Sequence, residues 1–364
     1  MLALKPIDSC VYDEISLGEV MLRLDPGEGR IRCARSFKAW EGGGEYNVAK
    51  ALRKCFQMKT ATVTALADND IGYLIEDFMM EGGVDTRFIK WAPYDGIGGK
   101  VRNGLNFTER GFGARGAIGV SDRANSAASQ LKPGDMNWET IFGQFGTRWF
   151  HTGGIFSALS ETTAKTALEA VECAKKYDAA VSYDFNFRPS LWKDRGGKAK
   201  AQEVNRELVK YADVIIGGEA DFKGLLGPDA PVSGEGISFS DREGYKEIAE
   251  AVSAAYPNLK VIASALRKVK SATVNDWSAV CWADGQVYTG MSFEGLEIFD
   301  RVGGGDGFAA GLIYGLLNGL GMREALNYGV CHGALVMSTP GDTSMAIRQE
   351  VEDLMKGAGA GVQR

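Results

Sequence analysis

Histidine is scarce in this chain, which has only His151 and His332 among its 364 residues. The six cysteines are scattered and form no CxxC pair. Because zinc sites need Cys and His ligands at short, characteristic spacings, we expect no zinc site, and we assign both histidines to packing or hydrogen bonding. Cysteines without disulfide-like spacing predict a reduced, cytoplasmic protein. They are Cys10, Cys33, Cys55, Cys173, Cys281 and Cys331.

Positive charge is not in excess either. There are 41 Lys and Arg residues against 47 Asp and Glu residues, for a net charge of −6. This balance argues against nonspecific nucleic-acid binding and against docking on an anionic membrane. No apolar run reaches the roughly 18 residues of a membrane span. The N-terminus shows no basic segment followed by a long apolar stretch, so we expect no signal peptide.

Two common nucleotide-binding motifs are missing or out of context. Gly99-Lys100 and Gly197-Lys198 lack the following Ser or Thr and the earlier glycine of a Walker A loop. Gly305-x-Gly307-x-x-Ala310 matches the dinucleotide fingerprint formally. The residues after it predict two successive helices and no strand with an acidic end, which disfavours a nicotinamide enzyme.

The chain does have a run of three glycines before an acidic residue, in Asp300-Arg301-Val302-Gly303-Gly304-Gly305-Asp306. An apolar, helix-like run follows to about Leu317. Consecutive glycines let the backbone N–H groups point toward one spot, and a helix that starts there adds unpaired N–H groups and its positive dipole end. The motif predicts an anion seat for a phosphoryl group, with Asp306 as the base for a hydroxyl. A tight turn before a buried helix is the alternative.

The same helix carries glycines at a spacing of four, which places them on one face. We expect this face to pack closely on a sheet. The glycines concerned are Gly307, Gly311, Gly315 and Gly319.

Strand-like and helix-like segments alternate along the chain, which predicts a mostly parallel sheet with helices on both faces. Polar residues and glycines follow the strands, where such sheets place their ligands. Ser160 is the expected cap of one of the helices. The expected strands are residues 60–66, 149–152, 180–183, 214–216 and 261–264, and the expected helices include 71–81 and 243–255.

Two segments depart from this alternation, residues 21–40 and 100–121. They contain extended runs with charges and glycines, such as Arg30-Ile31-Arg32-Cys33-Ala34. We interpret them as antiparallel strands that form a small lid or a dimer-forming β-layer. A pair of surface hairpins without a role is the alternative.

Two further motifs fit a site with two ligands. Gly42-Gly43-Gly44-Glu45-Tyr46-Asn47 is a second glycine cluster that leads into a helix, and Asn47 could present its amide to a polyol. In the segment after the strand at 180–183, Asp184, Asn186 and Arg188 alternate, so an extended chain would point them to one side. Arg188 offers a planar fork for a carboxylate or phosphate. Simple pairing of Arg188 with Asp184 is the alternative.

Together these motifs resemble those of the ribokinase-like (PfkB) family of sugar kinases, and within it the branch that acts on 2-keto-3-deoxygluconate. The resemblance extends from Gly18-Glu19-Val20-Met21-Leu22-Arg23-Leu24 to Pro340-Gly341-Asp342, and its most specific parts are residues 303–306 and 184–192. It implies an α/β fold, with a three-layer α/β/α ribokinase-like core and a small β lid. We expect the core at residues 8–20, 41–98 and 124–356 and the lid at 21–40 and 99–123.

The resemblance also implies site residues. Asp306 would be the catalytic base, beside an anion hole formed by the N–H groups of Gly303, Gly304, Gly305 and Asp306. Gly42, Gly43, Asn47 and Asn106 would line the sugar site. Arg123 and Arg188 would hold the acid end of the substrate or the incoming phosphate. ATP would contact Ser264, Leu266 and Arg267 as well as Gly303 and Gly305, with Mg²⁺ as its counter-ion.

Three positions depart from the family pattern. Gly218-Glu219-Ala220-Asp221 has a glycine where the family usually has an asparagine, so Glu219 and Asp221 would act on the metal indirectly. Asn106 and Ser121 stand where lid tyrosines often cover the substrate.

We therefore expect an ATP-dependent kinase that phosphorylates the terminal hydroxyl of a small sugar acid, 2-keto-3-deoxygluconate or a close analogue. The alternatives are a kinase of fructose or 5-keto-2-deoxygluconate, and a catalytically weak sugar-binding relative. We expect a homo-oligomer formed through the β lid.

Overall fold

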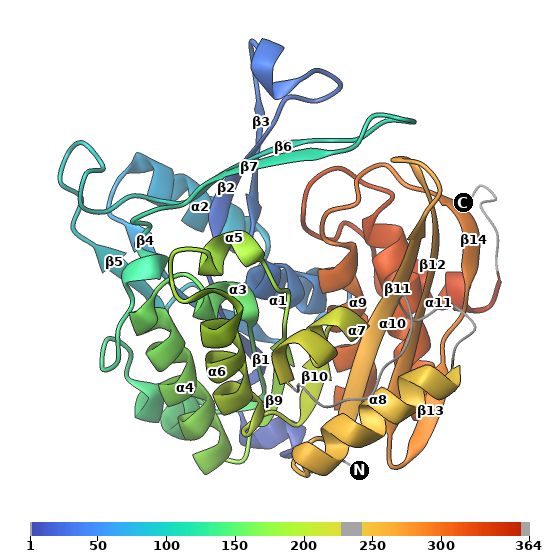
Figure 1. Ribbon diagram of the computed structural model, residues 1–364. Helices are drawn as coiled ribbons and strands as arrows, with labels where there is room; N and C mark the ends of the chain where they lie inside the picture. Colours follow the sequence, from blue (N-terminus) through green and yellow to red (C-terminus); the bar gives the residue numbers. More distant parts are fainter. Residues whose placement is uncertain (1, 227–241, 358–364) are drawn as a thin grey trace.

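A wide twisted sheet with helices on both sides forms the body of the protein, and a smaller sheet stands off it (Figure 1). The computed structural model describes residues 2–226 and 242–357, apart from the side chain of Glu219. Within these residues no helix combines the length and the apolarity that crossing a bilayer would require.

The large sheet runs in the order β13-β12-β11-β10-β9-β8-β1-β4-β5, with β14 paired to β12. Neighbouring strands from β5 to β11 are parallel, whereas β12 to β14 are antiparallel. The expected parallel core is confirmed, and the antiparallel edge was not foreseen. The strands are β1 (Tyr12–Leu17), β4 (Thr60–Ala67), β5 (Ile89–Ala92), β8 (Thr147–Gly153), β9 (Ala180–Asp184), β10 (Val214–Ile216), β11 (Val261–Val269), β12 (Val274–Ala283), β13 (Gln286–Thr289) and β14 (Phe293–Glu297).

Each face of this sheet is covered by its own helices and has its own apolar core. Residues of α4, α6 and α8 pack in one core, and residues of α1, α9, α10 and α11 pack in the other. These two layers make the α/β/α sandwich that the sequence predicted. The helices are α1 (Gly44–Lys54), α2 (Asp70–Glu81), α3 (Gly154–Ser157), α4 (Glu161–Lys176), α5 (Pro189–Trp192), α6 (Gly197–Val209), α7 (Glu219–Asp221), α8 (Arg242–Ala255), α9 (Gly304–Leu317), α10 (Met322–Val336) and α11 (Arg348–Met355).

Local sequence signals account for several helix starts. The hydroxyl of Ser160 accepts a 3.0 Å hydrogen bond from the Thr163 N–H and caps α4, as expected. The Asn69 side chain accepts hydrogen bonds from the N–H groups of Ile71 and Gly72 and caps α2 in the same way. Such caps satisfy N–H groups that the first helical turn leaves unpaired.

The smaller sheet has the order β3-β2-β6-β7 and lies above the carboxyl ends of the central strands (Figure 1). Its strands are β2 (Met21–Asp25), β3 (Lys38–Gly42), β6 (Leu105–Glu109) and β7 (Ile118–Asp122). They fall in the two segments expected to form a lid, except that β3 extends two residues beyond the expected end at residue 40. Two further details differ from the expectation. β2 and β6 pair in parallel, and Ile31–Cys33 forms a short 3₁₀ turn where an extended run was expected.

The glycine stripe of α9 contacts a helix, not the sheet as we expected. A Cβ at Gly311 would meet the backbone of Tyr328, and a Cβ at Gly315 would meet Ala325, both on α10. The two helices can therefore pack with their backbones unusually close, which fixes where the start of α9 lies.

Candidate active site

A cavity of about 590 Å³ lies between the carboxyl ends of the central strands, the starts of α1 and α9, and the lid. Residues that end β9 and β10, Asp184 and Ile216, form part of its wall, as do Met21 and Asn106 of the lid. Parallel sheets place ligands at this end because the loops there diverge and helix N-termini point toward it.

The start of α9 forms one wall. Gly303 has φ +81°, and a Cβ there would overlap the carbonyl oxygen of Asp342, so only glycine fits. Among the described side chains none caps this helix, and its first N–H groups therefore remain available to a ligand. Gly303 and Gly305 line the cavity, whereas Gly304 packs against Met337.

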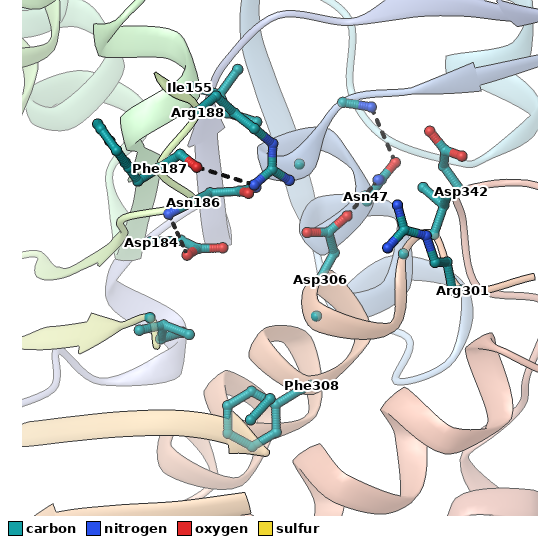
Figure 2. A pocket seen from close by; sticks show the side chains of 18 of the residues that line it. Asn47, Ile155, Asp184, Asn186, Phe187, Arg188, Arg301, Asp306, Phe308 and Asp342 are labelled. Carbon is teal, nitrogen blue, oxygen red and sulfur yellow. Dashed lines mark hydrogen bonds between the residues drawn. The ribbon is translucent and has the colours of Figure 1, made fainter. Parts of the chain in front are cut away.

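Asp306 lies at the centre of the cavity wall and faces Asn47 of α1 (Figure 2). The Asn47 amide donates a 2.6 Å hydrogen bond to Oδ2 of Asp306. Burial raises the pKa of Asp306 to about 6, against the lowering effects of this hydrogen bond and of Arg188. A carboxylate with a pKa near neutrality can take a proton in one step and release it later.

The start of α1 forms the opposite side of the cavity. Gly43 and Gly44 line it with Asn47, and a Cβ at Gly44 would lie 3.7 Å from both Asn186 and Asp306. Gly42, expected in the sugar site, does not line the cavity, and a Cβ there would meet the carboxylate of Asp342.

The lid contributes polar groups above this wall. The Ser121 hydroxyl donates a 3.1 Å hydrogen bond to the Asn106 side chain, and both residues line the cavity. Arg123 also lines it, but its guanidinium already binds the buried carboxylate of Glu19, through Nε at 2.8 Å and through Nη2. Glu19 accepts a further hydrogen bond from Ser126. The side chain of Arg123 is therefore held in place before any substrate arrives.

The segment after β9 lines the cavity with Asp184, Asn186 and Arg188, as expected, but it does not do so by strand alternation. Asn186 has φ +36°, so the chain turns there, and Phe187 lines the cavity as well. Among the described residues the guanidinium of Arg188 donates its only hydrogen bond to the carbonyl of Phe187, at 3.3 Å, and it forms no ion pair with Asp184.

Three arginines without an ion-pair partner among the described residues surround the cavity: Arg188, Arg267 and Arg301. Burial, with a smaller contribution from Arg301, lowers the pKa of Arg267. Positive groups that repel one another in this way are stabilised by a polyanion such as a triphosphate.

The cavity also has an acidic side. Burial raises the pKa of Asp184 well above its usual range, and the nearby carboxylates of Asp306 and Asp221 raise it further. Asp221 accepts a 2.9 Å hydrogen bond from the Gly218 N–H. Within the described residues no three His, Cys, Asp or Glu side chains come close enough to hold a metal ion by themselves. Paired carboxylates suit a hydrated Mg²⁺ that is carried mainly by phosphates. The side chain of Glu219 lies outside the described part.

Of the nucleotide contacts expected on β11, only Arg267 lines the cavity, because neighbouring side chains of a strand point to opposite faces. Ala265 and Arg267 line the cavity, whereas Ser264 is buried and Leu266 packs into the apolar core on the other face. A strand alternates its side chains between two faces, so one set of neighbours cannot all reach the same cavity.

Several cavity residues had no assigned role in the sequence interpretation. Arg301 belongs to the triglycine motif itself, and a basic residue beside an anion seat was a usable signal. Met21, Ile155 and Asp342 carry no such signal, because only the fold brings them to the cavity.

Comparison with known proteins agrees with this geometry. The profile of the pfkB family carbohydrate kinases matches residues 8–349. The crystal structure of 2-dehydro-3-deoxygluconokinase from Thermotoga maritima is 35% identical, with a TM-score of 0.85 over 94% of this chain and 99% of that one. The 2-dehydro-3-deoxygalactonokinase of Haloferax volcanii is 27% identical over 96% of this chain and 98% of its own length. The 5-dehydro-2-deoxygluconokinase of Clostridium perfringens is 25% identical over 90% and 88%, respectively.

The matched profile spans most of the chain and includes both helix starts and the lid that surround Asp306. The chain therefore belongs to the pfkB family of carbohydrate kinases, enzymes that transfer a phosphoryl group from ATP to an alcohol.

Proposed function

We propose that the protein uses ATP to phosphorylate the terminal hydroxyl of 2-keto-3-deoxygluconate or a close analogue. The observation that carries the proposal is the Asp306 carboxylate, held by Asn47 beside an uncapped helix start inside a cavity rimmed by arginines. The named relatives, a 2-dehydro-3-deoxygluconokinase and a 2-dehydro-3-deoxygalactonokinase, support a 2-keto-3-deoxy sugar acid as the substrate class.

Each part of the cavity then has a task. Asp306 accepts the hydroxyl proton while the alcohol attacks, and the N–H groups at the start of α9 stabilise the charge on the transferring phosphoryl group. Arg188 and Arg301, which flank Asp306 in Figure 2, hold the phosphates. Mg²⁺ bound with ATP would neutralise phosphate charge, with Asp221 and Asp184 as the carboxylates that face it.

The sugar acid is expected to lie between α1 and the lid. Gly43 and Asn47 would contact its hydroxyls from below, and Asn106 and Ser121 from above. Arg123 would meet its carboxylate with the guanidinium edge that Glu19 leaves unused, since only Nε and Nη2 bind Glu19.

The test is an ADP-release screen across sugars. The panel comprises 2-keto-3-deoxygluconate, its C4 epimer 2-keto-3-deoxygalactonate, 5-keto-2-deoxygluconate and fructose, each with Mg²⁺ and ATP. The proposal expects the highest kcat/KM for one of the two 2-keto-3-deoxy acids. A preference for fructose would contradict the substrate class, and binding of the acids without ADP release would identify a sugar-binding protein.

Location and assembly remain predictions. All six cysteines, which lie in the described residues, are free, and this supports a reducing compartment such as the cytoplasm. Phe112, Ile118 and Val120 of the lid hairpin are exposed, which supports association of two copies through the lid. Sedimentation of the wild type and of Val120→Lys would test it, because a lid-mediated dimer should dissociate in the variant.

A further inference from the structure

Arg23 lies on the lid strand β2, yet its side chain ends among residues that shape the phosphoryl site. It is fully buried, and its guanidinium binds three carboxylates. Nη2 binds Asp25 at 2.9 Å and also Asp300, while Nη1 binds Asp342. All three carboxylates are buried as well. One cation therefore connects the lid with two loops far away in the sequence.

Both loops lie against the start of α9. Asp300 precedes Gly303 by three positions, and its Oδ1 accepts a 3.1 Å hydrogen bond from the Val302 N–H. Asp342 lies so close to Gly303 that a Cβ there would overlap its carbonyl oxygen. The two loops that Arg23 joins thus determine the course of the backbone into the first turn of α9.

The position of Arg23 on the lid sheet is equally well defined. Met21 and Arg23 are two positions apart on β2, and Arg23 pairs in register with Asn106 on β6. Side chains at these positions share one face of the sheet. Met21 and Asn106 line the cavity from this face. The anchor of Arg23 therefore sets how that face lies above the cavity.

We propose that Arg23 is a positioning residue that fixes the sugar-facing side of the lid and the anion seat of α9 relative to each other. The role rests on the kinase function proposed above. We expect lysine to be a poor replacement, because the guanidinium reaches the carboxylates through two separate nitrogens, whereas a lysine has a single one. Without a cation the buried carboxylates would repel one another, and the loop from Asp300 to Gly303 would move.

A purely structural role is the rival, and a matched control separates the two. Arg148 is also buried, and it binds Asp13 at 3.2 Å and the carbonyl of Leu317 at 2.8 Å. Leu317 ends α9, so Arg148 holds the far end of the same helix. Arg148→Gln should reduce stability without disturbing the anion seat.

The experiment compares Arg23→Gln with Arg148→Gln under conditions where both are folded. We expect Arg23→Gln to lower kcat on the order of 100-fold, as the loss of an oxyanion donor does, with far smaller changes in KM for sugar and ATP. We expect Arg148→Gln to keep kcat near the wild-type value. Guanidinium chloride at millimolar concentration should restore part of kcat to Arg23→Ala, and sodium chloride at the same concentration should not.

Amide hydrogen exchange supplies a readout that needs no substrate. Arg23→Gln should speed exchange at residues 299–307, and Arg148→Gln should leave that segment unchanged. Unaltered exchange there in Arg23→Gln, or an equal loss of kcat in both variants, would overturn the proposal. If the wild type releases no ADP with any sugar, the kinase proposal fails, while the exchange measurement still decides the role of Arg23.

Discussion

The Asn47 amide donates a 2.6 Å hydrogen bond to the carboxylate of Asp306, across 259 positions of sequence. Asn47 lies in the first turn of α1 and Asp306 in the first turn of α9. Two helix starts are thereby directed at one cavity, and both dipoles favour the anionic form of a ligand between them. The hydrogen bond also opposes the effect of burial on Asp306, so that its pKa rises only to about 6.

Asp306→Asn should bind ATP and sugar but turn over very slowly. The asparagine keeps the shape and can still face Asn47, but it cannot accept the hydroxyl proton. We expect kcat to fall by roughly 10²–10⁴-fold, the usual contribution of a general base. ADP release and calorimetric binding of ATP check this expectation, and a variant with near-normal turnover would reject Asp306 as the base.

Asn47→Ala should shift the pH dependence of the reaction. The base must be deprotonated to act, so kcat/KM should rise with pH through the pKa of Asp306, about 6 in the wild type. Removal of the Asn47 hydrogen bond raises this pKa, because that bond stabilises the charged form. The acidic limb of the pH–rate profile should move to higher pH. Ser121→Ala, which changes the lid side of the cavity, is the control and should leave the limb in place.

Replacing Asp306 should lower activity but raise the stability of the folded protein. The pKa is raised from 3.8 unfolded to about 6 folded, so the folded state binds more protons between these values. The free energy of unfolding therefore falls as pH rises through this window. Asp306 is only partly buried, so solvent weakens this effect. Asp306→Asn should therefore stabilise the protein by about 1–2 kcal/mol at pH 7 and by much less at pH 4. Urea unfolding at both pH values measures the difference.

Local chemistry made much of the fold predictable. The cap of α4 at Ser160 and the strand Val214–Ile216 follow from short-range patterns. The start of α9 at Gly304 was predictable because a long apolar, helix-like run begins directly after the three glycines. The contacts of its glycine stripe were not, since a close-packed face does not reveal whether a sheet or a helix covers it.

The site was less predictable than the fold wherever long-range contacts decide it. The pattern Asp184, Asn186, Arg188 predicted the right residues through an extended chain, but the backbone turns at Asn186. Arg23 was part of the quoted motif, yet nothing local indicates that its partners are Asp300 and Asp342. Ion pairs between distant loops depend on the tertiary fold, which no local periodicity encodes.

Gly303 and Gly305 should respond differently to alanine. Gly303 has φ +81° and would overlap Asp342, so Gly303→Ala should cost at least the about 1–2 kcal/mol of a left-handed backbone. Apart from its chain neighbours and the nearby backbone of its own helix, no described atom lies within 4 Å of a Cβ at Gly305, and alanine favours helix. Gly305→Ala should therefore fold normally but lose kcat, since its methyl group enters the phosphoryl site. Thermal unfolding with kcat separates the two effects, and normal turnover in Gly305→Ala would place the phosphates elsewhere.

Arg123 can be tested as a carboxylate ligand only together with Glu19. Arg123→Ala alone leaves the buried Glu19 carboxylate without its ion pair, which costs about 3–5 kcal/mol and would obscure any effect on binding. Glu19→Gln removes that charge, so the double variant is the informative one and Glu19→Gln its control. A hydrogen bond to a charged group is worth about 1.5–3 kcal/mol, so kcat/KM for a sugar acid should fall about 10–100-fold more than for fructose. Equal losses for both sugars would show that Arg123 holds the lid to Glu19 and does not select the acid.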